Sequence, residues 1–503
     1  MKNAPVIRPA SAGGGTNLYI PLLFVSVILL TLLQSREAKA QYHDNNWIFG
    51  YGNLGNNPNA PGGGVRLHFE NGYPESSKEK INFSYNAYCA VCSDSSGLLA
   101  FHTNGRQIRN RLHDLMENGD TINPGFLYEN YPDGYPSISG GMTLPAPGYD
   151  NCYYLIHTSA NNDLSSDIVF PIIYYSFIDM NANGGLGKVV SKNNILAEGD
   201  IPQPTGIKHG NGRDWWLLIP DYLHFGIQTF LIDPTGIHYM GDQEQNAYFL
   251  THADNYSYCR ASPDGRYFAI NENLSGLWLY DFDRCSGLLS NQRRLPYQYP
   301  FYSSSLEFSA DSRFLYLGTH LVVYQMDMQS VDALPYVDID TIARYEYGAS
   351  PYPPWYTHFL LPQIGPDGKI YYGTFSGTMA YHVINRPEFP LLASDFAQRG
   401  LLVPRFRNGT WCYFPNYRLG RLEGSPCDTV SARSVEDRVF QHRHWEQPAT
   451  FPPAQAPRIL RLPPWFHIPD SVPEPEREEE AYPLSIRAIN QRLRTSSNHP
   501  VIE

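Results

Sequence analysis

The sequence contains little charge and no long basic run. Asp, Glu, Lys and Arg make up only 17% of the 503 residues, and the formal net charge is −12. A nucleic-acid surface needs clustered Lys and Arg, so this composition excludes nucleic acid as a partner. In contrast, the 41 Gly, 41 Pro and 37 Tyr favour turns and pleated strands over helices.

Only one long apolar run occurs, Leu18–Leu33, and Pro21 interrupts it. Two basic residues precede the run and Ala38-Lys39-Ala40 follows it, which is the order of a secretory signal peptide. The run is shorter than the ~20 residues that span a bilayer. We therefore expect residues 1–40 to be removed before Gln41. The mature chain is expected to be secreted or held at the cell surface or outer membrane, without a membrane span.

The sequence also lacks a recognisable cysteine framework. It has seven cysteines, an odd number, and a single C-x-x-C pair, Cys89 and Cys92, whereas a zinc site needs a second pair. In a strand these two side chains point to opposite faces. They are predicted to be buried thiols rather than a redox or metal site. A chain of this length can build its core without staples, so we expect it to fold without a metal or disulfide, and the pairing of any disulfides stays open.

One unit recurs between Trp47 and Leu419: a short polar turn followed by an alternating, aromatic-rich strand. The turns lie roughly 45 to 65 residues apart, a period typical of propellers and solenoids. The six turns are Ser93–Gly97, Pro147–Asn151, Asn211–Asp214, Ser262–Gly265, Ser309–Ser312 and Gly365–Gly368.

Further strand-like runs follow several of these units, which gives each repeat the three or four strands of one propeller blade. The sequence therefore predicts an all-β fold, a seven-bladed β-propeller, with six or eight blades as alternatives. The runs Trp47–Gly52 with Val65–Phe69 and Trp411–Leu419 are expected to complete the seventh blade. Joining the two ends in this way would remove exposed sheet edges.

The composition changes near residue 430. Residues 431–503 contain 11 Pro and no Lys, and such a segment buries too little apolar surface to offset the entropy of ordering. The predicted organisation is a signal peptide at 1–40, a propeller domain at 41–430 and a mostly disordered tail at 431–503.

Several motifs, taken in order, resemble a known family. They include Trp47-Ile-Phe-Gly-Tyr-Gly52, Lys208-His-Gly-Asn-Gly212, Tyr280-Asp-Phe-Asp-Arg-Cys-Ser-Gly287 and Pro415-Asn-Tyr-Arg-Leu-Gly420. Across residues 41–430 the chain resembles the N-terminal WD-like or YVTN-like propellers of exported proteins from gliding bacteria that use type IX secretion. The resemblance implies an extracellular or surface propeller and carries over no catalytic residue.

Catalytic signatures are missing. No H-E-x-x-H or G-x-S-x-G occurs, so neither zinc hydrolysis nor a nucleophile elbow is supported. The run Asp179-x-Asn181-x-Asn183-Gly184 copies half of a calcium loop, but Val190 stands where a bidentate Glu is required. We read it as a polar hairpin turn. No catalytic residue, metal or cofactor is predicted.

The expected function is a non-catalytic binding or scaffold module, a monomer, for an extracellular protein or glycan. The alternative is a propeller hydrolase or lyase that acts on an extracellular polymer. A binding module needs only a shaped, aromatic-rich face, whereas an enzyme needs titratable groups brought together.

Five residues are predicted to line the binding face. Arg260, Glu307 and Gln363 each lie two residues before a repeated turn and alternate with apolar neighbours, so they share one face of equivalent strands. We expect that face to point to the central channel, with Arg260 and Glu307 paired across adjacent blades. Lys208 and His209, at the end of another such strand, are the remaining candidates.

Overall fold

The structure is a computed structural model. It describes residues 41–50, 63–70, 73–81, 83–135, 141–162, 168–199, 203–221, 226–244, 258–272, 276–295, 305–333, 339–346, 357–374, 378–407 and 411–428. The expected signal peptide and the tail at 431–503 lie outside the described residues. Among the described residues no helix is both long and apolar enough to cross a bilayer.

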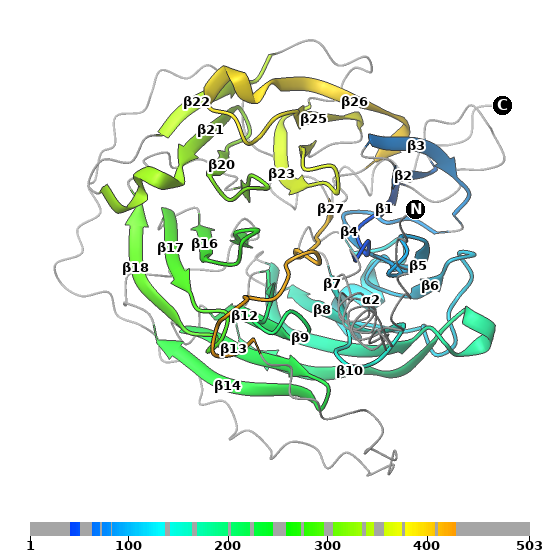
Figure 1. The fold of residues 1–503 in the computed structure, drawn as a ribbon. Helices are drawn as coiled ribbons and strands as arrows, with labels where there is room; N and C mark the ends of the chain where they lie inside the picture. The colour runs from blue at the N-terminus through cyan, green and yellow to red at the C-terminus, as the bar shows by residue number, and fades with distance from the viewer. Residues whose placement is uncertain are drawn as a thin grey trace, which may run out of the picture.

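Seven antiparallel-rich sheets stand around a common axis, like blades of a propeller (Figure 1). The predicted all-β, seven-bladed fold is confirmed. Regular helix is confined to α2 (Phe126–Asn130) and the short 3-10 turns η1 (Asn183–Gly185), η2 (Met328–Ala333) and η3 (Leu391–Ser394) within the described chain.

Four of the sheets follow one plan, in which consecutive strands run from the axis to the rim. They are β11 (Thr205–Lys208), β12 (Trp215–Asp221), β13 (Gly226–Asp233) and β14 (Gly236–Glu244); β15 (Tyr258–Ala261), β16 (Tyr267–Glu272), β17 (Gly276–Phe282) and β18 (Leu289–Leu295); β19 (Ser305–Phe308), β20 (Phe314–Gly318), β21 (Val322–Asp327) and β22 (Ile339–Arg344); and β23 (Phe359–Ile364), β24 (Ile370–Thr374), β25 (Thr378–Ile384) and β26 (Phe396–Arg407).

A fifth sheet has the same consecutive order, and the last two involve the ends of the domain. The fifth comprises β7 (Met142–Pro145), β8 (Cys152–Asn162), β9 (Ile168–Asp179) and β10 (Lys188–Glu198); the other two comprise β1 (Asn46–Gly50), β2 (Gly64–Glu70) and β3 (Tyr73–Glu79), and β27 (Trp411–Cys412) with β4 (Tyr88–Ser93), β5 (Leu99–Thr103) and β6 (Ile108–Asn110).

Burial falls from the axis to the rim, as the sequence pattern requires. All seven residues of β12 are buried, whereas β14, two strands further out in the same blade, has one buried residue and is otherwise half-buried or exposed. A strand covered on both faces reads as a continuous apolar run, and a rim strand does not. The core therefore lies in the interfaces between blades.

Three of the predicted turns share one conformation. In Ser262–Gly265, Ser309–Ser312 and Gly365–Gly368 the fourth residue donates its backbone N–H to the carbonyl of the first, at 2.8, 2.8 and 2.9 Å. Gly265 and Gly368 have φ near +75° (72° and 80°), whereas Ser312 adopts φ 60° at the same position with a side chain. Glycine meets this left-handed requirement without a steric penalty. These turns mark one face of the propeller, which we call the lower face.

The two ends of the domain meet, but not in one sheet. Trp47 of β1 lies with its ring centroid 5.9 Å from that of Phe414, so both termini close the ring as expected. The ladder of β27, however, pairs in parallel with β4, joining Trp411 to Tyr88 and Cys412 to Cys89. The expectation that Trp47–Gly52 and Trp411–Leu419 form one blade is corrected, because β27 is only two residues long and the chain then leaves the sheet.

Removing residues 41–52 is expected to destabilise the propeller far more than removing 431–503. The first deletion takes away β1, all of whose residues are buried, and leaves the neighbouring strand as an open edge. Thermal unfolding of the two truncated proteins beside the parent checks this. Equal losses of melting temperature would contradict it.

Candidate functional site

Three polar side chains converge at the propeller axis. Arg260 on β15, Glu307 on β19 and Gln363 on β23 occupy the same strand position in three consecutive blades. Arg260 Nε lies 3.3 Å from Glu307 Oε2, and each side chain is only 4% exposed. The predicted pairing across adjacent blades is confirmed.

The guanidinium of Arg260 is fully engaged. One terminal nitrogen donates to Gln203 Oε1 at 3.1 Å and to the carbonyl of Cys259 at 2.9 Å, and the other donates to the carbonyl of Pro362 at 3.4 Å. The ring centroid of Tyr413 lies 4.5 Å from its central carbon. Arg260 thus connects several blades at the axis, because each hydrogen bond to a buried cation offsets part of its desolvation.

Glu307 accepts two backbone hydrogen bonds besides the ion pair. Oε1 accepts from Phe308 N at 3.1 Å and Oε2 from Ile364 N at 3.3 Å. Burial raises the pKa of Glu307, while Arg260 and these two amides act in the opposite direction. The pair is therefore a buried structural ion pair, and not part of an open face that lines the channel, as the sequence suggested.

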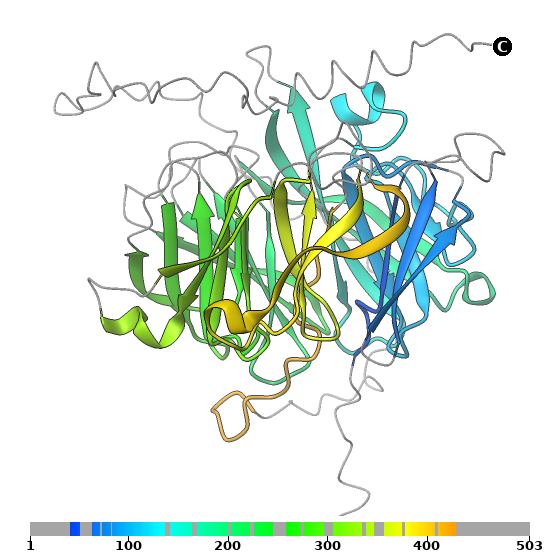
Figure 2. The same cartoon turned by 90° about the horizontal axis from the view of Figure 1, so that it is seen from above.

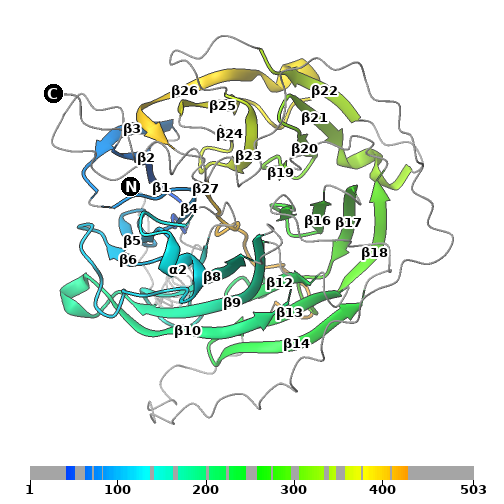
Figure 3. The same cartoon turned by 180° about the vertical axis from the view of Figure 1, so that it is seen from behind.

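Gln363 holds a segment of the chain that runs along the channel. Its side-chain amide donates to the carbonyl of Phe414 at 3.4 Å, and its carbonyl accepts from Phe414 N at 3.3 Å. The amide side chain thus satisfies both the backbone donor and the backbone acceptor of one residue. We call residues Tyr413–Asp428 the channel segment. It passes from β27 across the middle of the ring and emerges on the lower face (Figures 1, 2 and 3).

Other blades hold the channel segment further along. The hydroxyl of Tyr417 donates to the carbonyl of Thr143 at 2.7 Å, and its ring packs edge-on against Trp215 at 5.9 Å. Asn416 Nδ2 donates to the carbonyl of Pro263 at 2.7 Å. The chain's own residues therefore fill the channel near its axis. The expected ligand-lining face is covered, because Tyr413–Tyr417 leaves the sheet where the sequence suggested a strand.

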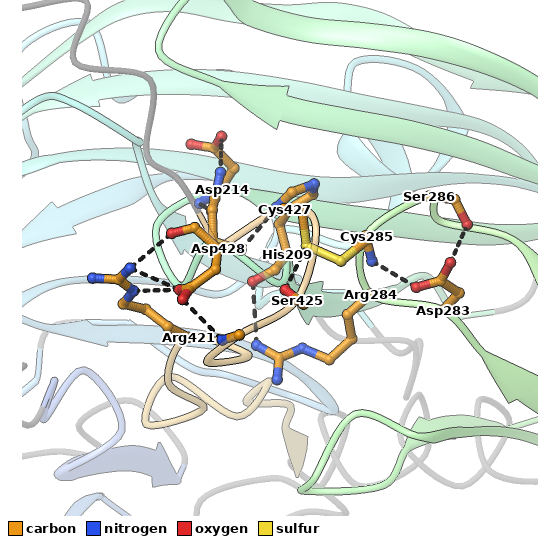
Figure 4. The surroundings of a disulfide bond; sticks show 12 residues. His209, Asp214, Asp283, Arg284, Cys285, Ser286, Arg421, Ser425, Cys427 and Asp428 are labelled. Carbon is orange, nitrogen blue, oxygen red and sulfur yellow. Dashed lines mark hydrogen bonds and ion pairs between the residues drawn. A yellow bond between two sulfur atoms is a disulfide. The ribbon is translucent and has the colours of Figure 1, made fainter.

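Two disulfides bracket the channel segment. Cys412, directly before it, pairs with Cys89 of β4, and Cys427, near its end, pairs with Cys285 in the turn after β17 (Figure 4). The prediction that Cys89 is a buried thiol is therefore wrong. It failed because the partners are 323 and 142 residues apart in sequence, which no local spacing reveals.

For Cys92 the prediction of a buried thiol is confirmed. Cys92, Cys152 and Cys259 are free and buried. Cys92 also packs in a different core cluster from Cys89, as residues on opposite faces of a strand should.

Lys208 and His209 lie at the lower end of β11. Lys208 is 2% exposed, and its ammonium lies 4.2 Å from the ring centroid of Trp215. His209 packs against Trp216 at 5.4 Å. In the described chain no hydrogen bond or ion pair joins either side chain to Arg260, so the five predicted residues form two separate groups. Their role in binding stays a prediction.

Burial lowers the pKa of Lys208 to about 7, while Asp214 acts in the opposite direction. No carboxylate pairs with its ammonium within the described residues. A buried cation without a paired carboxylate is costly to the folded state, and the face of Trp215 and the charge of Asp214 offset only part of that cost. Lys208 therefore lowers the free energy of unfolding of the protein near neutral pH.

Lys208→Met is expected to stabilise the protein near neutral pH. Because the folded pKa is lowered from 10.5 to about 7, the wild type is least stable below pH 7 and gains stability as pH rises toward 10. The free energy of unfolding of the variant should not rise with pH in this range. At pH 7 it should exceed that of the wild type by on the order of a few kcal/mol. Denaturant unfolding at pH 7 and pH 9.5 measures this, and equal differences at both would contradict it.

A chain of hydrogen bonds that the sequence did not reveal lies between β3 and β5. Tyr85 Oη lies 2.6 Å from His102 Nδ1, His102 Nε2 lies 2.8 Å from His113 Nδ1, and His113 Nε2 lies 2.8 Å from Glu79 Oε1. Burial lowers the pKa of His102 well below its usual value. Tyr85 and His102 are fully buried, so the inner half of this chain cannot meet a substrate.

A second chain has the residue types of a nucleophilic site. His157 Nδ1 lies 2.6 Å from Asn123 Oδ1, and its Nε2 lies 2.8 Å from Ser176 Oγ. A working nucleophile must be reachable, yet all three side chains are almost fully buried. Burial also lowers the pKa of His157 to about 3. This group therefore holds neighbouring strands together.

In the described part of the chain no three side chains of the His, Cys, Asp or Glu type gather as metal ligands could. The half calcium loop is a hairpin turn as predicted. Asp179 Oδ1 accepts from both the backbone and side-chain nitrogens of Asn181 at 2.9 Å. These two bonds fix the turn from within.

No protein-family model and no curated protein matches the sequence. Similar solved structures include a protein from Lactobacillus plantarum, 12% identical, with a TM-score of 0.43, covering 73% of this chain and 98% of that one. Others are Chaetomium thermophilum Sqt1 bound to the N-terminus of ribosomal protein L10 (13%, TM-score 0.35, 68% and 82%) and an exo-β-1,3-galactanase from Phanerochaete chrysosporium (10%, 0.31, 53% and 58%). These likenesses do not assign a function to this chain.

Proposed function

We propose that the protein is a non-catalytic propeller that binds another protein outside the cell. The observation that carries this proposal is the channel segment. It fills the axis, the concave place where a propeller could hold a small substrate, and a disulfide fixes it at either end. His102 and His157, the central residues of the two hydrogen-bonded chains described above, are fully buried.

Two disulfides support an oxidising compartment, since disulfides persist there and are rare in the cytosol. The predicted signal peptide at 1–40 and the resemblance to propellers of type IX secretion agree with delivery to the cell surface. In this proposal residues 41–430 form the binding unit, and Lys208 and His209 lie beside the face that a partner meets.

The lower face supports a protein partner over a glycan. Three turns on this face expose large apolar side chains to solvent: Leu98 is 63% exposed, Leu288 59% and Leu392 83%. These turns follow β4, β17 and β25, and they share the face on which the channel segment emerges. Exposed large apolar side chains on several blades of one face are compatible with a protein interface.

A peptide and glycan array probed with oxidised protein tests the proposal. We expect peptide or protein capture that Leu98→Glu and Leu288→Glu each abolish. Leu402→Glu on the outer strand β26, where the parent side chain is 60% exposed, is the matched control and should leave capture intact. Glycan-only capture, or turnover of a polysaccharide by the parent protein, would contradict it and favour the hydrolase or lyase alternative.

A further inference from the structure

The two disulfides differ in their access to solvent. Cys89 is fully buried and Cys412 nearly so, whereas Cys285 and Cys427 are both partly exposed. A thiol reagent attacks only a sulfur that it can reach. In the native state the two disulfides should therefore react with a thiol reagent at very different rates.

The channel segment becomes more exposed to solvent toward its end, where Cys427 lies. Its first part is buried down to Tyr417, and residues 418–428, which we call the strap, are exposed or half-buried on the lower face. Arg418 forms a two-pronged ion pair with Asp44 at 2.6 and 2.7 Å. Leu422 N donates to the carbonyl of Gly210 at 2.8 Å. These few polar contacts and one disulfide hold the strap down.

Gly210 makes room for that disulfide. A β-carbon at this position would overlap Cys427 Sγ and lie 3.2 Å from Cys285 Sγ. The sulfurs thus sit directly on the turn after β11, one residue from His209. The disulfide is the covalent contact between the strap and the blades beneath it (Figure 4).

We propose that Cys285–Cys427 is a thiol–disulfide exchange site for an external dithiol, and that its reduction releases the strap while Cys89–Cys412 stays intact. This inference does not depend on the proposed binding function. It requires only that one bond is reachable in the folded protein and the other is not. The propeller would then keep its closure while its lower face changes.

The chemistry follows from the surroundings of the sulfurs. A thiolate of the dithiol attacks Cys285 Sγ, the S–S bond breaks, and Cys427 leaves as a thiolate. Ser425 Oγ lies 3.4 Å from Cys427 Sγ and can donate a hydrogen bond to that leaving group. The second thiol of the dithiol then attacks the mixed disulfide. Two electrons and two protons pass to Cys285 and Cys427, and the dithiol becomes a disulfide.

Release of the strap would alter the charge at the channel mouth. Asp44 would lose the guanidinium of Arg418, and Arg284 would lose its 2.5 Å hydrogen bond to the carbonyl of Gly420. Both groups, one acidic and one basic, would become free for a partner on the lower face. The oxidised and reduced proteins would thus present different surfaces.

Native full-length protein treated with dithiothreitol tests the proposal. Differential alkylation and peptide mass mapping follow the four cysteines separately. We expect Cys285 and Cys427 to be reduced at least about tenfold faster than Cys89 and Cys412, because the buried bond reacts only through opening of the fold. Trypsin should then cut after Arg418 and Arg421 in the reduced protein but not in the oxidised protein.

Two variants keep the test decisive. Ser425→Ala removes the hydroxyl and should slow reduction of the exposed bond several-fold without changing the buried one. The double variant Cys285→Ser with Cys427→Ser should be cut at the strap without any reductant. Equal reduction rates for the two bonds, or a strap that resists trypsin after reduction, would overturn the proposal.

Discussion

Replacing Glu307 by alanine is expected to lower the free energy of unfolding by about 3–5 kcal/mol, the usual cost of leaving a buried ion without its partner. Arg260 would keep its charge at the propeller axis, where it is 3% exposed. The loss should include the two backbone amides, Phe308 and Ile364, that now donate to the carboxylate. Urea unfolding at pH 7 measures the change.

A surface ion pair gives the matched control. Lys188 Nζ lies 2.8 Å from Glu117 Oε1 with both side chains nearly half exposed. Glu117→Ala should change stability by only about 0–1 kcal/mol, as exposed pairs do. Replacing Arg260 by Met together with Glu307 by Leu should recover most of the loss, since no buried charge remains. A loss at Glu307 no larger than at Glu117 would refute the buried-pair interpretation.

Removing the buried disulfide should have an effect of similar size. Cys89→Ala combined with Cys412→Ala is expected to cost about 2–5 kcal/mol, the range for native disulfides. The bond joins residues 323 apart and fixes β27, whose ladder is only two residues long. Without it, the channel segment would be anchored at its first end by hydrogen bonds alone. Thermal and denaturant unfolding of the oxidised proteins measure the loss.

Cys259→Ala serves as the control for the loss of a buried sulfur. Cys259 is a free, fully buried thiol, and its removal should cost about 1 kcal/mol, less than a larger core side chain. The disulfide variant should also be insensitive to reductant at this site, while the parent loses stability as the buried bond is slowly reduced. An unchanged stability in the double variant would show that the ladder and hydrogen bonds suffice to hold β27.

The periodic parts of the fold could be predicted from local sequence. The repeated turns, such as Ser262–Gly265 and Gly365–Gly368, set the position of each inner strand, because their shared Pro-Asp-Gly sequence specifies the turn chemistry. The same alignment placed Arg260 and Glu307 on adjacent blades and predicted that they would pair. Strand alternation also separated Cys89 from Cys92.

The candidate site was predicted less well. The sequence of Tyr413–Tyr417 is typical of an aromatic strand, yet the segment runs through the channel. There it contacts Gln363, Thr143 and Trp215. These contacts are distant in sequence, so local sequence could not predict them. The hydrogen-bonded pairs of Asn123 with His157 and of His102 with His113 likewise join residues whose types and spacing match no motif.

By itself, the sequence determined the all-β class and the inner strand position of the channel residues and favoured seven blades over six or eight, because these depend on short-range turn chemistry and on the two-residue period of strands. Only the tertiary structure decided that Cys89 meets Cys412, that Cys285 meets Cys427 and that the channel is filled. Those outcomes depend on which distant segments the closed ring brings within one side-chain length of each other. The number of residues between two segments does not predict how far apart they lie in space.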